Sequence, residues 1–221
     1  MFNMAYVPPH RRQQGSSPAL YYKPLLLSKN VSFFDTWLVS NSEDIIRNHS
    51  QKYQEFLSES EKNADGVQLN GIPFQISRDG NGNDIFAGEG KVVIPLEEAI
   101  EASSVHLIVN CVWGKKNEVI GRVTFVPETA DVACTNATSP ISVELKVGIN
   151  VRDHILGGFC NTVKNGESVL RLPGKYDDNL NSKYSLRLDS VRFDLPRSFK
   201  LKEIVFENFG LGEPQGDALL W

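Results

Sequence analysis

Cysteines, histidines and long apolar runs are scarce in this chain of 221 residues, which has three cysteines and four histidines. Cys111, Cys134 and Cys160 are spaced too widely for a CxxC metal clip and are too few for a disulfide framework. No apolar stretch approaches the ~20 residues that span a bilayer, and the first residues lack the basic, apolar and small-residue order of a secretory signal. We therefore expect a cytoplasmic or nuclear protein with no membrane partner.

Three Asn-x-Ser/Thr sequons, at Asn30, Asn48 and Asn136, would instead suit a secreted glycoprotein. So short a pattern arises easily by chance, and no signal segment accompanies it. The intracellular interpretation is therefore favoured.

Net charge is also small, because 23 basic residues stand against 27 acidic ones and give −4. Hydrophobic residues make up 41% of the chain and aromatic residues 10%, which is enough for a core. The bulk of the chain is therefore neither disordered nor a polyanion-binding protein by charge alone. At ~150 residues per domain, the length suits one substantial domain with appendages.

Acidic residues are absent before Asp35, whereas Arg11, Arg12, Lys23 and Lys29 are basic. Several prolines and a Gly-Ser-Ser run in the same stretch oppose both a helix and a packed strand. These features predict a flexible basic tail over residues 1–30.

Residues 6–12, with the sequence YVPPHRR, resemble short N-terminal segments of many RNA-associated and translation-associated proteins, including DEAD-box helicases. The resemblance implies a peptide that binds a protein partner or an RNA backbone. A solubilising tail is the favoured alternative, because four positive charges give little phosphate affinity at physiological salt. Nucleic acid is therefore expected only as a weak partner of the tail.

Residues 31–65 predict a helical segment that packs on the rest of the protein. Apolar side chains recur there at three- and four-residue steps from Ile45 to Leu57. Ser42, followed by Glu43 and Asp44, suits the beginning of a helix. We expect that helix to extend over about 42–62.

From Gly66 onward the apolar period changes to two, as in residues 141–147, where apolar and polar side chains alternate. The turn residues 114–117 predict a hairpin between their flanking strands, and a change of phase at Asp189 and Ser190 predicts a bulge or a bend. Many short strands without βαβ alternation predict a mainly β fold, an antiparallel jelly-roll β-sandwich over residues 66–221. The expected strands are roughly 67–76, 91–96, 105–113, 118–126, 141–147, 168–172, 184–195, 201–206 and 218–221.

Several of these stretches resemble, in their order, the galactose-binding-like β-sandwich modules found beside the catalytic domains of glycoside hydrolases and polysaccharide lyases. The stretches are 71–74 (GIPF), 92–96 (VVIPL), 105–113, 119–126, 147–153 (VGINVRD) and 201–206 (LKEIVF). The resemblance implies a non-catalytic accessory domain, whose relatives bind carbohydrate or pack against a neighbour. The family often has tryptophan after the aspartate of the Asn-x-x-Asp segment, where this chain has His154.

Carbohydrate recognition needs a flat aromatic face and several planar polar side chains. Residues of both kinds could meet at one edge of the sandwich. In the alternative arrangement, Trp113 caps the core, Arg152 and Asp153 form a surface ion pair, and the loop around Tyr176 is only a turn. The candidate ligand-binding residues are Trp113, Asn150, Arg152, Asp153, His154 and Tyr176.

Other chemistries are less well supported. Residues 79–84 (DGNGND) look like a calcium loop, but Asp84 and Gly90 stand where that motif needs glycine and glutamate, so a hairpin turn is favoured. Cys160 and His154 could make a thiol nucleophile and its base, yet no family signature surrounds them. Paired carboxylates are adjacent in sequence rather than opposed. We therefore expect no enzyme activity, no metal and no cofactor.

The leading functional hypothesis is a non-catalytic module that binds a glycan or a glycosylated partner. The alternative is an intracellular scaffold for proteins or ribonucleoprotein that binds no sugar. An exposed aromatic plane beside polar side chains would favour the first, whereas a large exposed apolar patch would favour the second.

Overall fold

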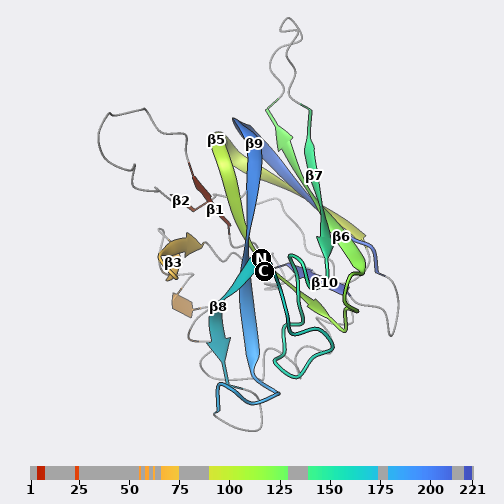
Figure 1. Ribbon diagram of the computed structural model, residues 1–221. Coiled ribbons are helices and arrows are strands. Elements are labelled where there is room, and N and C mark those ends of the chain that lie inside the picture. Colours follow the sequence, from red (N-terminus) through yellow and green to blue (C-terminus); the bar gives the residue numbers. More distant parts are fainter. Residues whose placement is uncertain are drawn as a thin grey trace, which may run out of the picture.

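The structure is a computed structural model. It describes residues 4–7, 23–24, 55, 58–59, 62, 66–74, 90–128, 139–173, 179–210 and 217–220. Ten β-strands lie in these ranges (Figure 1). They are β1 Met4–Val7, β2 Lys23–Pro24, β3 Val67–Leu69, β4 Ile72–Phe74, β5 Gly90–Val112, β6 Val119–Pro127, β7 Ile141–Lys146, β8 Gly166–Leu172, β9 Leu186–Asn208 and β10 Asp217–Leu220. The predicted mainly β class is confirmed.

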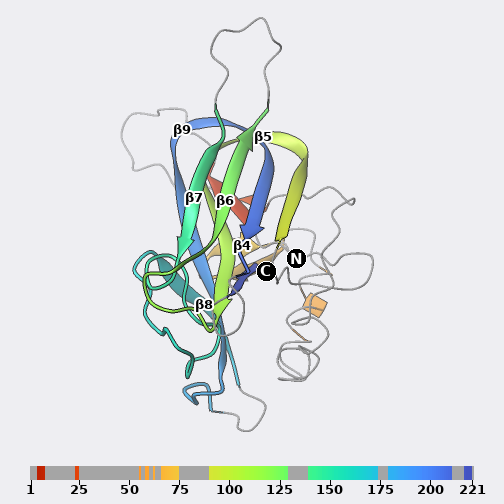
Figure 2. The same cartoon turned by 90° about the vertical axis from the view of Figure 1, so that its right-hand side faces the viewer.

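The long strands β5 and β9 run antiparallel and form the centre of the sheet. The second half of β9 pairs with β6 on one side and with the first half of β5 on the other. The first half of β9 pairs with β8 and with the second half of β5. Register shifts interrupt the β5–β9 ladder between Pro95 and Ile100 and between Ala102 and Ser104. Such irregularities bend strands, and Figure 2 shows the sheet curling at this level.

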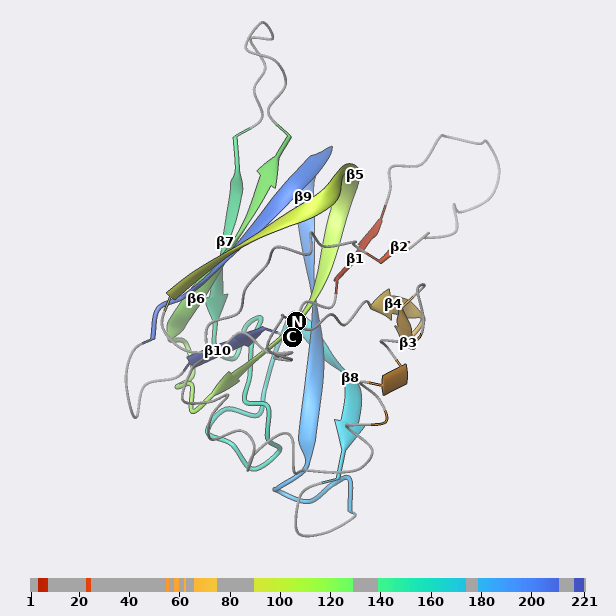
Figure 3. The ribbon, with the colours of Figure 1, turned by 180° about the vertical axis from the view of Figure 1, so that it is seen from behind.

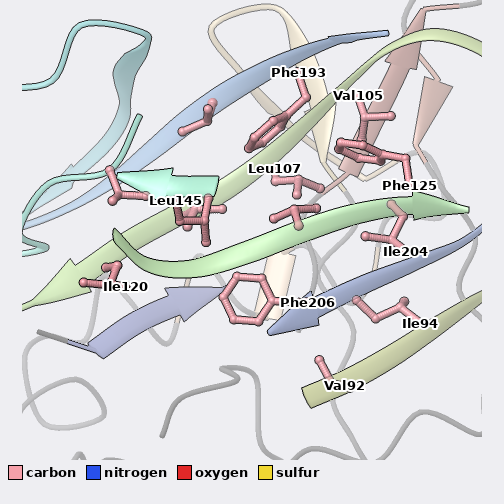
Figure 4. Close-up of a cluster of buried hydrophobic side chains, with 14 of the residues drawn as sticks. Val92, Ile94, Val105, Leu107, Ile120, Phe125, Leu145, Phe193, Ile204 and Phe206 are labelled. Atoms are coloured by element: carbon pink, nitrogen blue, oxygen red, sulfur yellow. The ribbon is translucent and has the colours of Figure 1, made fainter. Parts of the chain in front are cut away.

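The concave side of the curled sheet holds the hydrophobic core (Figure 4). Leu107, Val109 and Leu145 have no exposed surface, and Val143 packs against them at the margin. The rings of Phe125 and Phe193 lie 5.5 Å apart across the two halves. Burial of these predicted inward-facing side chains is therefore confirmed, but the predicted alternation with a polar face is wrong for β5 from Ser104 to Val112, where both faces are buried.

Some strands are longer or shorter than the sequence predicts. Residues 91–96 and 105–112 belong to one strand, β5, which ends before Trp113, and residues 184–195 and 201–206 belong mostly to β9. The predicted strand 67–76 is instead the β3–β4 hairpin. Its turn, Asn70–Gly71, has φ angles of +50° and +77°, as favoured for a two-residue hairpin.

Two predicted local features need correction. The chain does turn at Lys115–Glu118, where the amide of Glu118 donates to the carbonyl of Lys115 (3.0 Å). The predicted hairpin is nevertheless wrong, since β6 pairs with β7 and β9 and not with β5. At Asp189 the register shift lies in the partner strand β8, between Ser168 and Leu170. The apolar phase changes there because β9 is buried on both faces from Leu186 to Val191.

The segments before Gly66 are described only in part. Met4–Val7 pairs with Ser104–Leu107 of β5, and Lys23–Pro24 pairs with β1, so these six positions of the predicted tail form strands. A strand added to β5 satisfies backbone groups that an open edge would leave unpaired. Of residues 31–65 the structure describes only positions 55, 58, 59 and 62, which have helical backbone. The helix over 42–62 stays a prediction.

Candidate functional site

The candidate site lies where the end of β5 and the beginning of β9 separate, and the segment Arg152–His154 fills the gap between them. The amide of Cys111 donates to the carbonyl of Arg152 (2.9 Å), and the amide of His154 donates to the carbonyl of Cys111 (3.0 Å). On the other side, the amide of Arg187 donates to the carbonyl of His154 (2.8 Å). The inserted segment therefore replaces a ladder between β5 and β9 and carries its side chains into the interior.

A buried polar cluster supports this segment, and it consists of Asn110, Arg152, Asp153, Arg187 and Asp189. The carboxylate of Asp189 accepts hydrogen bonds from Arg152 Nε (2.7 Å) and Nη2 (2.8 Å) and from Asn110 Nδ2 (2.9 Å). Its backbone amide donates to Asn110 Oδ1 (3.1 Å). Asp189 is 1% exposed. These hydrogen bonds therefore compensate for the water contacts that its carboxylate loses on burial.

Arg187 is the largest fully buried side chain in this region, at 2% exposed. Its Nε donates to the backbone carbonyl of Asp153 (2.8 Å), and its Nη2 donates to Asn161 Oδ1 (2.8 Å). Arg187 Nε also lies 3.8 Å from Asp189 Oδ2. The guanidinium therefore holds both ends of the segment 153–161 against β9.

Burial and neighbouring charge act differently on the two arginines. Burial, followed by the positive charge of Arg152, lowers the pKa of Arg187 from its usual value. The hydrogen bonds that Arg152 donates to Asp189 raise the pKa of Arg152. Two arginines and two aspartates leave the cluster neutral overall, which is the arrangement in which buried charges are tolerated.

Beside the cluster lies a pocket of about 440 Å³, here called the aromatic pocket. Three aromatic side chains, Trp113, Phe159 and Tyr184, line it. Phe159 is 72% exposed and Tyr184 43% exposed, although large apolar side chains are usually buried. The ammonium of Lys183 lies 4.9 Å from the centre of the Tyr184 ring. The mouth of the pocket therefore presents aromatic surface together with a cation.

Asp153 shapes the floor of the aromatic pocket. Its Oδ2 accepts a hydrogen bond from the amide of Trp113 (3.2 Å), and its Oδ1 accepts one from the amide of Ile155 (3.1 Å). Trp113 has a φ of +54°, a left-handed backbone that costs free energy in a non-glycine residue. The bond to Asp153 helps to hold that backbone, and so it places the indole at the end of β5.

His154 lines the aromatic pocket, and one of its two ring nitrogens has no partner in the part of the chain that the structure describes. Its Nδ1 lies 3.2 Å from the carbonyl oxygen of Cys111 and 3.3 Å from Asp153 Oδ1. Both neighbours are acceptors, so we assign a proton to Nδ1. The Nε2 atom is buried and has no hydrogen-bond partner among the described residues. A buried polar atom of this kind is a natural contact for a ligand.

Two glycines close one wall of the aromatic pocket. A Cβ on Gly158 would overlap the carboxylate group of Asp153, and a Cβ on Gly157 would come within 2.7 Å of Lys183. Both positions therefore require glycine, because the loop backbone approaches these side chains directly.

The structure brings Trp113, Asp153 and His154 together at the aromatic pocket, as three of the predicted ligand-binding residues. Asn150 instead closes the turn after β7, since its Oδ1 accepts from the amide of Lys146 (2.7 Å) and its Nδ2 donates to the carbonyl of Glu144 (2.8 Å). Arg152 pairs with Asp189, so the alternative of a surface pair with Asp153 is also wrong. Tyr176 lies outside the described residues.

Sequence reasoning missed Phe159, Lys183 and Tyr184. Gly157-Gly158-Phe159 places a large apolar residue in a loop, which is a weak signal of an exposed aromatic side chain. Tyr184 was expected in a strand, whereas it ends the turn before β9. Only the fold brings these two loops to the end of β5.

The described residues do not form the catalytic pair or the metal site that the sequence made conceivable. The Cys160 thiol lies 3.7 Å from the carbonyl of Thr162, and His154 Nδ1 contacts Cys111 and Asp153 instead. In the part of the chain that the structure describes, no three His, Cys, Asp or Glu side chains gather as metal ligands. None of its described helical positions forms a helix long and apolar enough to cross a membrane. The glycine-rich segment 79–84 is outside the described ranges.

Comparison of the chain with protein-family models, with curated proteins and with solved structures finds no match. The resemblance to galactose-binding-like modules therefore rests on the sequence pattern.

Proposed function

We propose that this chain is a non-catalytic binding module whose aromatic pocket takes one sugar ring of a glycan. The observation that carries the proposal is that one pocket is lined both by exposed aromatic side chains and by His154, whose buried Nε2 has no partner in the described structure. A pyranose has apolar C–H faces and hydroxyl edges, and this pocket offers surfaces for both. We propose, together with sugar binding, that the chain is a galactose-binding-like module with jelly-roll connectivity.

The size and lining of the pocket support a small, partly apolar ligand. Its volume of about 440 Å³ falls within the usual range for small-molecule sites. Trp113 and Tyr184 would cover the faces of the ring, and His154 Nε2 would accept a hydrogen bond from a hydroxyl group. Asp153 is already bonded to two backbone amides, so its role is to position Trp113 and the loop rather than to bind the sugar.

A binding role fits the pocket better than catalysis does. His154 would need a nucleophile or an activated water to act as a base. The described residues that line the pocket supply no serine, threonine or cysteine side chain. Asp153 is the only carboxylate among them, so they also lack the opposed pair of a glycosidase.

The second candidate function is an intracellular scaffold for a protein or ribonucleoprotein partner, in the cytoplasm or nucleus. The exposed ring of Phe159 favours it, as does Leu180, which is 43% exposed and lies in the same loop as Tyr184. Exposed apolar groups of this kind mark protein contacts as well as ligand sites. The N-terminal basic residues would then add a weak electrostatic contact.

A glycan array followed by calorimetry distinguishes the two functions. The folded wild-type protein should bind a defined set of glycans, and Trp113→Ala and Tyr184→Ala should each weaken that binding by at least about tenfold. His154→Ala should weaken it too, because a ligand hydroxyl loses its acceptor. Phe209→Ala is the matched control, since Phe209 stacks on Arg122 and does not line the pocket. A folded protein that binds no glycan, or variants that bind as the wild type does, would overturn the carbohydrate proposal.

A further inference from the structure

A second hollow lies on the opposite face of β9 from the buried polar cluster. It encloses about 460 Å³ between the β8–β9–β5 part of the sheet and the β3–β4 hairpin. The hairpin lies beside β8 (Figure 3), and Asn70 Nδ2 donates to the carbonyl of Ser168 (3.4 Å). We call this site the polar hollow.

Strand register places polar side chains together in the polar hollow. Val191 and Phe193 face the hydrophobic core, so the alternate residues Ser190 and Arg192 face the other way. His106 is directly opposite Arg192 in the β5–β9 ladder. All three polar residues line the hollow.

His106 is a buried residue of the polar hollow rather than a surface side chain, because it is only 6% exposed. Its Nδ1 lies 3.3 Å from Ser190 Oγ. Burial, followed by the positive charge of Arg192, lowers its pKa from 6.5 to about 4. At neutral pH the imidazole is therefore uncharged, and it stands beside a cation.

Cations outnumber anions in the described lining of the polar hollow. Lys164 and Arg192 are positive, and Glu167 is negative. Asp194, beside the hollow, forms an exposed ion pair with Arg192 at 2.7 Å. The described residues of the β3–β4 hairpin carry no titratable side chains, and β1 carries no acidic or basic residue, its one titratable residue being Tyr6. The charges that face His106 from its neighbouring elements are therefore these four.

We propose that the polar hollow binds a small oxyanion, such as a sulfate, phosphate or carboxylate group, between Lys164 and Arg192 and beside His106 and Ser190. This inference is independent of sugar binding in the aromatic pocket. The arginine fork and the ammonium supply charge-assisted hydrogen bonds to oxygen atoms. Ser190 and His106 can donate further hydrogen bonds at the floor of the hollow.

Anion binding in the polar hollow is coupled to protonation of His106. An anion beside the imidazole stabilises its charged form and so raises its pKa in the complex. At pH values above the pKa of His106 in the complex, its imidazole is neutral in both the free and the anion-bound protein, so the affinity for the anion does not depend on pH. Between that pKa and the free value of about 4, the complex takes up a proton and affinity rises as pH falls. Below about pH 4, His106 is protonated in both the free and the anion-bound protein, and the affinity stops rising.

Sulfate is the best probe, because its own charge does not change between pH 5 and pH 7. We expect calorimetry on the full chain in chloride buffers to show sulfate binding that tightens by up to about tenfold for each pH unit over part of this range. The NMR signals of the His106 ring should move toward the charged form as sulfate is added. Acetate and phosphate, tested in parallel, show whether the hollow prefers a planar carboxylate or a tetrahedral anion.

Charge variants on the exposed rim test the site without disturbing the core. Arg192→Gln and Lys164→Gln should each weaken sulfate binding by about three- to fivefold, and Glu167→Gln should strengthen it by a similar factor. His106→Gln should remove the pH dependence. Lys91→Gln is the control, because Lys91 is exposed on β5 away from the hollow. Absence of binding for all three anions, or equal affinities in the rim variants and the control, would overturn the inference, whatever the glycan array shows.

Discussion

The guanidinium of Arg152 donates two hydrogen bonds to the carboxylate of Asp189, at 2.7 and 2.8 Å, although 37 positions separate the two residues. This bidentate pair joins the inserted segment to the beginning of β9. Asp189 also bonds Asn110 at the end of β5. One carboxylate therefore ties together the three segments that surround the aromatic pocket.

Asp189→Asn should lower the free energy of unfolding by about 3–5 kcal/mol, because the buried guanidinium of Arg187 and the half-buried guanidinium of Arg152 would then share one aspartate. Urea unfolding followed by circular dichroism measures the change. Asp194→Asn removes a carboxylate from an exposed ion pair and should cost no more than about 1 kcal/mol. Equal stability of the two variants would show that the buried cluster does not stabilise the fold.

Gly158→Ala should disturb the aromatic pocket more than the fold. The added methyl group would overlap Asp153, so the carboxylate must move and release the amides of Trp113 and Ile155. We expect a loss of about 1–3 kcal/mol in stability and a changed tryptophan fluorescence spectrum. Gly166→Ala is the milder comparison, since its Cβ would lie 3.3–3.4 Å from its nearest atoms, which would have to move by only a few tenths of an ångström. If both variants kept the wild-type spectrum and stability, the close approach of Gly158 to Asp153 would be contradicted.

His106 should make the protein less stable in mild acid. Its pKa is about 4 in the folded protein and near 6.5 when the chain is unfolded, so the unfolded state binds more protons between these values. The stabilisation is fully present above about pH 6.5 and is lost as pH falls toward 4, by up to about 3 kcal/mol. Urea unfolding in chloride buffers from pH 7 to pH 4 measures this slope.

His106→Gln should flatten the slope, whatever its effect on stability at pH 7. Sulfate should also reduce the loss of stability of the wild-type protein at low pH, because it binds the folded state. A slope that is the same in the wild type and in His106→Gln would assign the acid sensitivity to other groups.

Period-two alternation predicted one face of the core, although β5 is buried on both faces from Ser104 to Val112. Leu107, Val109 and Leu145 are fully buried as expected, because a pleated strand turns every second side chain to the same face. The same rule could not show that residues 91–96 and 105–112 form one strand. Residues 97–101 between them are exposed or half-buried and include Glu97 and Glu98, so they resemble a loop when the pairing with β9 is unknown.

The site was predicted in part for a similar reason. Asp153 and His154 were recognised as planar polar groups beside a candidate aromatic residue, and they do lie with Trp113. Arg187 and Asp189 were assigned to a strand and given no role, since nothing local shows that a strand residue faces a gap filled by another segment. Their partner Arg152 reaches them only through the fold.

Because β5 and β9 each pass through both halves of the curled sheet, neither half can detach and leave the other intact. Gly90 pairs with Asn208, and Ile108 pairs with Ser190, so almost the whole described chain after Phe74 must be synthesised before the ladder can close. Such long-range pairing slows folding, and we expect the two halves of the sheet to unfold together. Cutting either strand at its bend would therefore abolish both the aromatic pocket and the polar hollow at once.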